Sequence, residues 1–134
     1  MSIRHIATTL APKAIGPYSQ GVVANGFVYT AGQCPFHETT GDIVGTDIQT
    51  QTAQSLKNLK AVVEAGGSSF RSVIKTTVFL KDMNHFAKMN EVYAKAFADT
   101  SFPPARSAVE VARLPKDVLV EIECVAMVEK NANI

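Results

Sequence analysis

An arginine and a glutamate that could act together on a small carboxylic acid stand in the C-terminal part of the chain. Residues 102–124 alternate with a period of two, which predicts two strands joined by a turn at residues 114–117. Side chains one residue apart on a strand point to opposite faces of its sheet. If the apolar faces of these two strands lie on the same side, Arg106 and Glu121 emerge together on the other side.

The chemistry of this pair suits a small acidic substrate. The planar guanidinium of Arg106 matches a carboxylate through two parallel hydrogen bonds, and the carboxylate of Glu121 can accept and donate a proton. The same alternation is also typical of a solvated face with alternating charges, which would have no catalytic role. The pattern alone leaves both interpretations open.

The length and the charge of the chain disfavour several classes of protein. Its 134 residues are expected to form one domain, residues 1–134. The formal net charge of +1 provides no basic footprint, so neither nucleic acid nor a membrane is expected as a partner. No apolar run reaches the ~18 residues that span a bilayer, and nothing near the N-terminus predicts secretion. The cytoplasm is the expected location. Because the N-terminal segment contains Arg4 and no acidic residue, a mitochondrial location is an alternative.

The cysteines and histidines do not predict a metal site. Cys34 and Cys124 are too few and too far apart for a disulfide framework or a zinc site, and the three histidines lack ligand-like spacing. Cys124 is expected to be a small core residue. Cys34, just before Pro35, is expected to be partly exposed, with no base nearby in the sequence. No metal and no cofactor are therefore expected.

Turn residues and hydrophobic periodicity predict the element order β-β-α-β-α-β-β. Asn25-Gly26 favours a type I′ hairpin, because both positions of that turn need positive φ. Thr46 or Asp47 can cap the following helix, and Gly66-Gly67 can end it. The expected elements are strands 21–24 and 27–31, helix 47–65, strand 72–81, helix 84–98, and the two strands within residues 102–128. They predict an α+β domain in which a mixed sheet carries two helices on one face.

The sheet face without helices is expected to be apolar in part. On the last strand, the covered face is predicted to hold Val118, Val120, Ile122, Cys124, Ala126 and Val128. The uncovered face then carries Leu119, Val125 and Met127, which is typical of an association surface. We therefore expect a homo-oligomer in which the face bearing Arg106 and Glu121 is turned toward a neighbouring subunit. A monomer with scattered apolar surface groups is the alternative.

Asn90 interrupts the apolar stripe of the second helix, which is formed by Phe86, Met89, Tyr93 and Phe97. A polar amide in such a stripe needs hydrogen-bond partners. We expect Asn90 to make a structural hydrogen bond and to take no part in catalysis.

Several segments resemble one known family, in the same order along the chain. They are Ala-Ile-Gly-Pro-Tyr-Ser-Gln at 14–20, Thr-Ala-Gly-Gln at 30–33, Lys-Thr-Thr-Val-Phe-Leu-Lys-Asp at 75–82, and the block at 104–123. Together they cover nearly the whole chain and resemble the reactive-intermediate deaminases, the RidA or YjgF family. The resemblance implies a chorismate-mutase-like α+β fold, assembled as a homotrimer with sites in the clefts between subunits.

The resemblance also implies an activity, that of a 2-iminobutanoate/2-iminopropanoate deaminase. Members hydrolyse short-lived 2-imino acids and their enamine tautomers, which pyridoxal-phosphate-dependent dehydratases release, to 2-oxo acids and ammonia. By this resemblance Arg106 binds the substrate carboxylate, and Glu121 orients and deprotonates the attacking water. The backbone N–H of Gly32 approaches the substrate carboxylate. The ring of Tyr18 forms one wall of the cleft. A second interpretation, in which Tyr18 is a core aromatic after a Gly-Pro turn, is equally compatible with the sequence.

Two positions depart from the family pattern. Many members carry cysteine where this chain has Ala108, and alanine serves equally well if the position acts through its backbone carbonyl. Ala108 therefore stays a candidate for substrate binding. A hydroxyl residue often stands at the position of Ala31, so one side-chain hydrogen bond to substrate is missing here. That difference bears on substrate preference more than on the type of reaction.

Two other functions compete with imine hydrolysis. One is an endoribonuclease that inhibits translation, but the near-neutral charge and the unpaired histidines argue against RNA cleavage. The other is a non-catalytic role, as a protein that binds small carboxylates through Arg106 or acts like a chaperone. The presence of Glu121 favours the enzyme.

Overall fold

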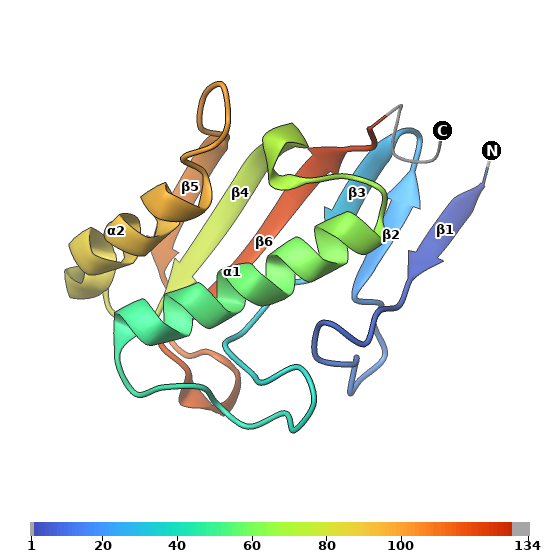
Figure 1. Ribbon diagram of the computed structural model, residues 1–134. Helices are drawn as coiled ribbons and strands as arrows, with labels where there is room; N and C mark the ends of the chain where they lie inside the picture. The colour runs from blue at the N-terminus through green and yellow to red at the C-terminus, as the bar shows by residue number, and fades with distance from the viewer. Residues whose placement is uncertain (1, 130–134) are drawn as a thin grey trace.

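Six strands form one mixed sheet, and two helices pack on one of its faces, in the computed structural model, which describes residues 2–129 (Figure 1). In chain order the elements are β1 (Ile3–Ile6), β2 (Gly21–Ala24), β3 (Phe27–Thr30), α1 (Ile48–Ala65), η1 (Phe70–Ser72), β4 (Val73–Leu80), η2 (Met83–His85), α2 (Phe86–Ala96), β5 (Ala105–Glu110), η3 (Pro115–Asp117) and β6 (Val120–Met127). The strand order across the sheet is β1-β2-β3-β6-β4-β5. The predicted α+β class is confirmed. β1 is an additional strand that the sequence did not predict, because it is short and mostly exposed.

Local signals set the ends of the first hairpin and the first helix. Asn25 and Gly26 have positive φ angles of 55° and 85°, as a type I′ turn between β2 and β3 requires. Of the two candidate caps, Asp47 begins α1, because its Oδ2 accepts a hydrogen bond from the N–H of Thr50 at 3.0 Å. The helix ends before Gly67, which takes the left-handed conformation at φ 87°.

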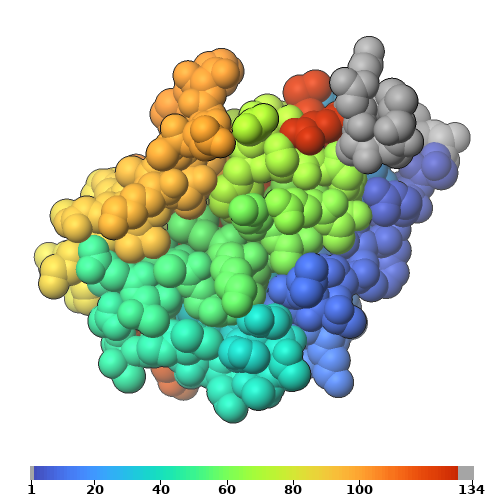
Figure 2. All heavy atoms as spheres, viewed as in Figure 1, coloured from blue at the N-terminus to red at the C-terminus, as the bar shows by residue number. Residues whose placement is uncertain are grey.

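The main core lies between the two helices and the sheet. In Figure 1, α1 (green) crosses in front of the central strand β6 (red), most of which is hidden in the same view of Figure 2. Side chains that are fully buried in this layer include Val28, Leu59, Val62, Val63, Val78, Leu80, Met89, Val120, Ile122 and Ala126. The two helices therefore lie on one sheet face and leave the other face without a helix.

The last two strands are not neighbours in the sheet, and this corrects a prediction. β5 pairs with β4 in parallel, whereas β6 pairs antiparallel with both β3 and β4. The strand–helix–strand unit β4-α2-β5 explains the difference, since a helical crossover returns the chain so that its two strands can lie side by side and parallel. β6 then fills the place between β3 and β4. The turn at 114–117 joins strands that are separated by β4.

Arg106 and Glu121 lie on opposite faces of the sheet within one chain. Along β4, Arg106 pairs with Thr76 and Glu121 pairs with Phe79, three residues further on. An odd separation along a strand places side chains on opposite faces. Arg106 therefore faces the helices, and Glu121 projects from the open face. The prediction that they emerge together is wrong because the apolar side of β5 is not its covered side: Val109 is 42% exposed on the open face.

The open face carries part of the apolar surface that the sequence predicts. Val125 is half-buried there, and Met127 is 50% exposed. Leu119, however, packs against the main core, and Val118 joins a second, smaller apolar cluster. The predicted alternation fails at these two residues because β6 begins only at Val120, after the η3 turn.

Candidate functional site

A cavity of about 400 Å³ opens beside the part of the open face from which Glu121 projects. The segment before β2, the loop after β3, η3 and β6 together form its walls. The lining residues are Pro12, Ile15, Tyr18, Gln20, Ala31, Gly32, Gln33, Cys34, Phe36, Pro115 and Glu121. Three of the five residues predicted for the site, Tyr18, Gly32 and Glu121, therefore meet in one cavity.

The carboxylate of Glu121 lies directly over the backbone of Gly32. A Cβ atom at position 32 would overlap Oε2 of Glu121 and would lie 2.7 Å from its Cδ. The two segments are held together one residue further on, where the N–H of Gln33 donates to the carbonyl of Ile122 at 2.8 Å and the carbonyl of Gln33 accepts from the N–H of Ile122 at 3.1 Å. Gly32 therefore makes room for the carboxylate, a role that the sequence pattern did not reveal.

The thiol of Cys34 is a direct neighbour of this carboxylate. Its Sγ lies 3.5 Å from Oε1 of Glu121, and Cys34 is buried, with 8% of its surface exposed. Burial raises the pKa of the Cys34 thiol far above its usual range, and the negative charge of Glu121 raises it further. The expectation of a partly exposed cysteine is thus wrong, and the carboxylate beside it comes from β6, which is distant in the sequence.

Tyr18 forms an exposed wall of the cavity. The residue is 51% exposed, so its interpretation as a core aromatic is wrong. The segment that carries it is held by buried Gln20, whose side chain accepts a hydrogen bond from the N–H of Thr8 at 2.7 Å. The same amide donates to the carbonyls of Thr8, Ala11 and Pro12 at 3.0, 3.3 and 2.8 Å. Gln20 therefore fixes one side of the cavity through backbone groups.

Arg106 and Ala108 lie away from this cavity, on the helix side of the edge strand β5. The guanidinium of Arg106 donates to Oδ1 of Asn90 at 2.6 Å and lies over the rings of Phe86 and Tyr93, 5.2 and 4.7 Å from their centroids. Asn90 therefore has a hydrogen-bond partner, as predicted, and that partner is Arg106. Ala108 packs against the main core. Within one chain, these two candidates are therefore separated from the other three.

The residues that line the Glu121 cavity include no lysine or arginine, which bears on what it can bind. An adjoining cavity of about 260 Å³ shares Tyr18 and Phe36 with it and is lined by Lys13 and Lys116. The Nζ atom of Lys116 lies 5.0 Å from the centre of the Phe36 ring. A small anion beside Glu121 would need a cation from this rim or from a second chain, because an unpaired buried charge is costly.

A row of buried amides on α1 supports the loop between β3 and α1. Gln51, Gln54 and Asn58 recur at spacings of three and four residues, and all three are buried. Gln51 donates to the carbonyl of Gly45 at 3.0 Å and accepts from the N–H of Leu119 at 2.8 Å. Their spacing is the signal that sequence reasoning could have used, since amides on the buried side of a helix need partners.

Within residues 2–129, no group of three or more histidine, cysteine, aspartate and glutamate side chains is placed to hold a metal ion. In the same range, no helix combines the length and the apolar character needed to cross a membrane.

Fold and cavity together define a class of protein: an α+β chain with both helices on one sheet face, and a carboxylate in a mostly apolar cavity beside the other. The sequence profile of the family described as Endoribonuclease L-PSP matches residues 8–128. A RutC family protein of Pyrococcus horikoshii is 59% identical over 124 residues, which cover 92% of this chain and 97% of that protein. The 2-iminobutanoate/2-iminopropanoate deaminase of Escherichia coli K12 is 51% identical over 123 residues, or 91% and 95% of the two chains. The crystal structure of E. coli TdcF with bound serine has a TM-score of 0.88 and 49% identity, and covers 92% of this chain and 98% of that one.

The chain belongs to the Endoribonuclease L-PSP family, which includes the RidA and YjgF proteins. The resemblance seen in the sequence motifs is therefore confirmed. The names of its relatives include an imine deaminase and RutC family proteins, so family membership alone does not decide the activity.

Proposed function

We propose that this protein hydrolyses reactive 2-imino acids, and their enamine tautomers, to 2-oxo acids and ammonia. The observation that carries the proposal is the position of Glu121, a carboxylate held over an open glycine backbone in a mostly apolar cavity. A cavity of this kind suits a small ligand, and a carboxylate inside it can take a proton from water and return it. The name of the E. coli relative, 2-iminobutanoate/2-iminopropanoate deaminase, supports the same reaction.

In the proposed reaction, Glu121 acts as a proton relay between water and the imine nitrogen. It accepts a proton from the water that attacks the imine carbon, and the π electrons of the C=N bond move to nitrogen. The first proton passes to that nitrogen and gives a tetrahedral amino alcohol. Glu121 then carries the hydroxyl proton to the amino group while the C–N bond breaks and the C=O bond forms. Water supplies the oxygen and both protons, so the reaction consumes no other reactant.

The substrate carboxylate is held, in this proposal, by Arg106 of a neighbouring copy of the chain. The Glu121 cavity is lined by no lysine or arginine, and Arg106 stands on the edge strand β5, where another chain can reach it. Ala108, on the same strand, would contribute its backbone carbonyl, whereas Gly32 would contribute its N–H and Tyr18 its ring. The assembly expected from the family resemblance is a homotrimer. The related TdcF structure holds serine, a small amino acid with a carboxylate, which supports this class of ligand.

Ammonia release from freshly generated 2-iminobutanoate tests the function. We expect the protein to accelerate release well above the spontaneous rate, and Arg106→Ala to lose about 10²-fold or more in kcat/KM, because two charge-assisted hydrogen bonds disappear. Lys116→Gln is the matched control, since it removes a cation from the rim of the adjoining cavity. If Lys116→Gln raises KM while Arg106→Ala leaves it unchanged, the carboxylate is held within one chain. No acceleration by the wild-type protein would exclude imine hydrolysis.

Gly32→Ala is expected to retain the fold and to lose about 10²-fold in kcat/KM. The new methyl group would overlap Oε2 of Glu121, and the end of a flexible side chain can move aside. A displacement of about 1 Å at a reacting group is sufficient for a loss of this size. Thermal melting and imine kinetics should be measured on the same samples. Gly16→Ala is the control, because a methyl group there meets only the Tyr18 ring at 3.5 Å; equal activity of the two variants would contradict the placing of Glu121.

The endoribonuclease named in the family description is not favoured by the cavity. Cleavage of RNA by acid–base chemistry needs paired groups and a basic surface for phosphates. The lining residues of the Glu121 cavity provide one carboxylate and no lysine, arginine or histidine. Incubation of labelled RNA alongside the imine assay tests this alternative directly.

A further inference from the structure

The two oxygens of the Glu121 carboxylate have different surroundings. Oε1 lies 3.5 Å from Sγ of Cys34, whereas Oε2 lies over Gly32, where an added Cβ would overlap it. The terminal torsion of a glutamate side chain is broad, and its two oxygens exchange readily unless a neighbour holds one of them. A general base needs a defined direction toward its water. The contact with sulfur can therefore decide which oxygen is presented to the substrate.

Cys34 is able to donate a hydrogen bond over the whole working pH range. Burial first, and the negative charge of Glu121 second, raise the pKa of the thiol far above its usual range. The sulfur therefore keeps its proton, and an ionised carboxylate is its natural acceptor. A thiol that is also 8% exposed has little water to compete for that proton.

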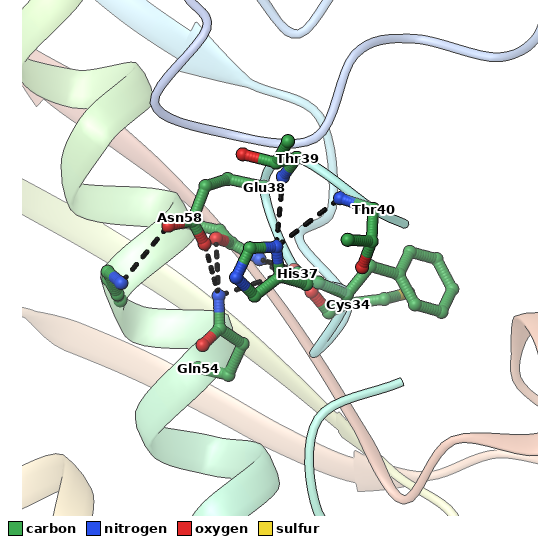
Figure 3. Close-up of polar contacts among 9 residues, drawn as sticks. Cys34, His37, Glu38, Thr39, Thr40, Gln54 and Asn58 are labelled. Atoms are coloured by element: carbon green, nitrogen blue, oxygen red, sulfur yellow. Dashed lines mark hydrogen bonds and ion pairs between the residues drawn. The ribbon is translucent and has the colours of Figure 1, made fainter. Parts of the chain in front are cut away.

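The position of the sulfur atom is fixed from α1. The fully buried amide of Asn58 donates to the carbonyl of Cys34 at 3.0 Å and to the carbonyl of Phe36 at 2.8 Å. Gln54 donates in turn to Oδ1 of Asn58 at 3.0 Å. Figure 3 shows these amides reaching from the helix to the loop that carries Cys34. Pro35 further limits the backbone of the residue before it. The thiol is thus held at a fixed place beside the carboxylate.

We propose that Cys34 is a positioning residue for Glu121: its thiol holds Oε1 and leaves Oε2 as the oxygen that receives the proton of the attacking water. The role in catalysis rests on the proposed imine hydrolysis, whereas the hydrogen bond itself does not.

Three substitutions separate the hydrogen bond from simple packing. Cys34→Ser keeps a donor, Cys34→Ala removes the donor and some volume, and Cys34→Val keeps an apolar group of similar size without a donor. We expect Ala and Val to lower kcat for 2-iminobutanoate about tenfold with little change in KM, and Ser to recover most of the rate. A packing role predicts the opposite order, with Val close to wild type and Ser impaired. That order would overturn the proposal.

The S–H stretching band of Cys34 provides a test without turnover. The band is isolated by subtracting the infrared spectrum of the matching Cys34→Ser chain, once for wild type and once for a Glu121→Leu chain. Donation to the carboxylate weakens the S–H bond, so we expect the band to move to higher frequency when Glu121 is replaced by leucine. An unchanged band would overturn the proposal even if the protein is active. A shifted band in a protein that does not hydrolyse imines would instead refute the proposed function and leave the hydrogen bond in place.

Discussion

Glu121→Gln is expected to slow imine hydrolysis by about 10²–10⁴-fold while binding of a small 2-oxo or amino acid is retained. Glutamine has nearly the same shape as glutamate and can still accept a hydrogen bond from the Cys34 thiol, which lies 3.5 Å from Oε1. It cannot take a proton from water at neutral pH. The change therefore removes the proposed proton relay and little else.

Ammonia release from 2-iminobutanoate, corrected for spontaneous hydrolysis, measures the loss, and calorimetry with a 2-oxo acid measures binding. Glu123→Gln is the matched control, because Glu123 lies two residues along β6 on the same sheet face, where it pairs with Thr77. If Glu121→Gln turned over the imine as fast as wild type, Glu121 would not be the general base. The site would then have to act by binding and orientation alone.

The main elements of the fold could be predicted from local sequence signals. The Asn25-Gly26 turn needs positive φ twice, and α1 has both a capping aspartate and a terminal glycine, so their ends follow from single residues. Strand neighbours are harder to predict, because turn residues at 114–117 suit a hairpin and a longer connection equally well. The β4-α2-β5 unit is the stronger indicator, since crossover strands tend to lie parallel and adjacent.

The faces of the edge strand could not be predicted from polarity. Arg106 faces the helices because its guanidinium finds two aromatic rings and an amide oxygen on α2, while its stem covers apolar surface. A period of two assigns alternate residues to two faces, but it does not say which face is covered. On β5, the charged side of the alternation is the covered one.

The candidate site, like the fold, could be predicted from the sequence only in part. Tyr18, Gly32 and Glu121 belong to segments that the family resemblance marks, and the structure brings them into one cavity. The contact between Cys34 and Glu121 joins residues 87 positions apart and depends on where α1 holds the intervening loop. No local pattern carries that information. Contacts of this kind arise only when the sheet is assembled.

Two inactive variants are expected to restore activity when they assemble together. Arg106 and Glu121 lie on opposite faces of one sheet and cannot converge on one small acid within a chain. A site shared between chains would combine the intact Arg106 of a Glu121→Gln chain with the intact Glu121 of an Arg106→Ala chain. If equal amounts assemble at random into rings, about one quarter of the sites receive both intact groups.

The experiment refolds the two variants from denaturant, separately and mixed, and compares ammonia release from 2-iminobutanoate. Light scattering on the same samples should give the mass of three chains. We expect the mixture to reach about one quarter of the wild-type rate, against the much lower rates of the separate variants. A site built within one chain gives no gain on mixing, because every chain then lacks one of its two groups. Recovery would therefore assign Arg106 and Glu121 to different subunits, and its absence in assembled trimers would require a carboxylate anchor other than Arg106.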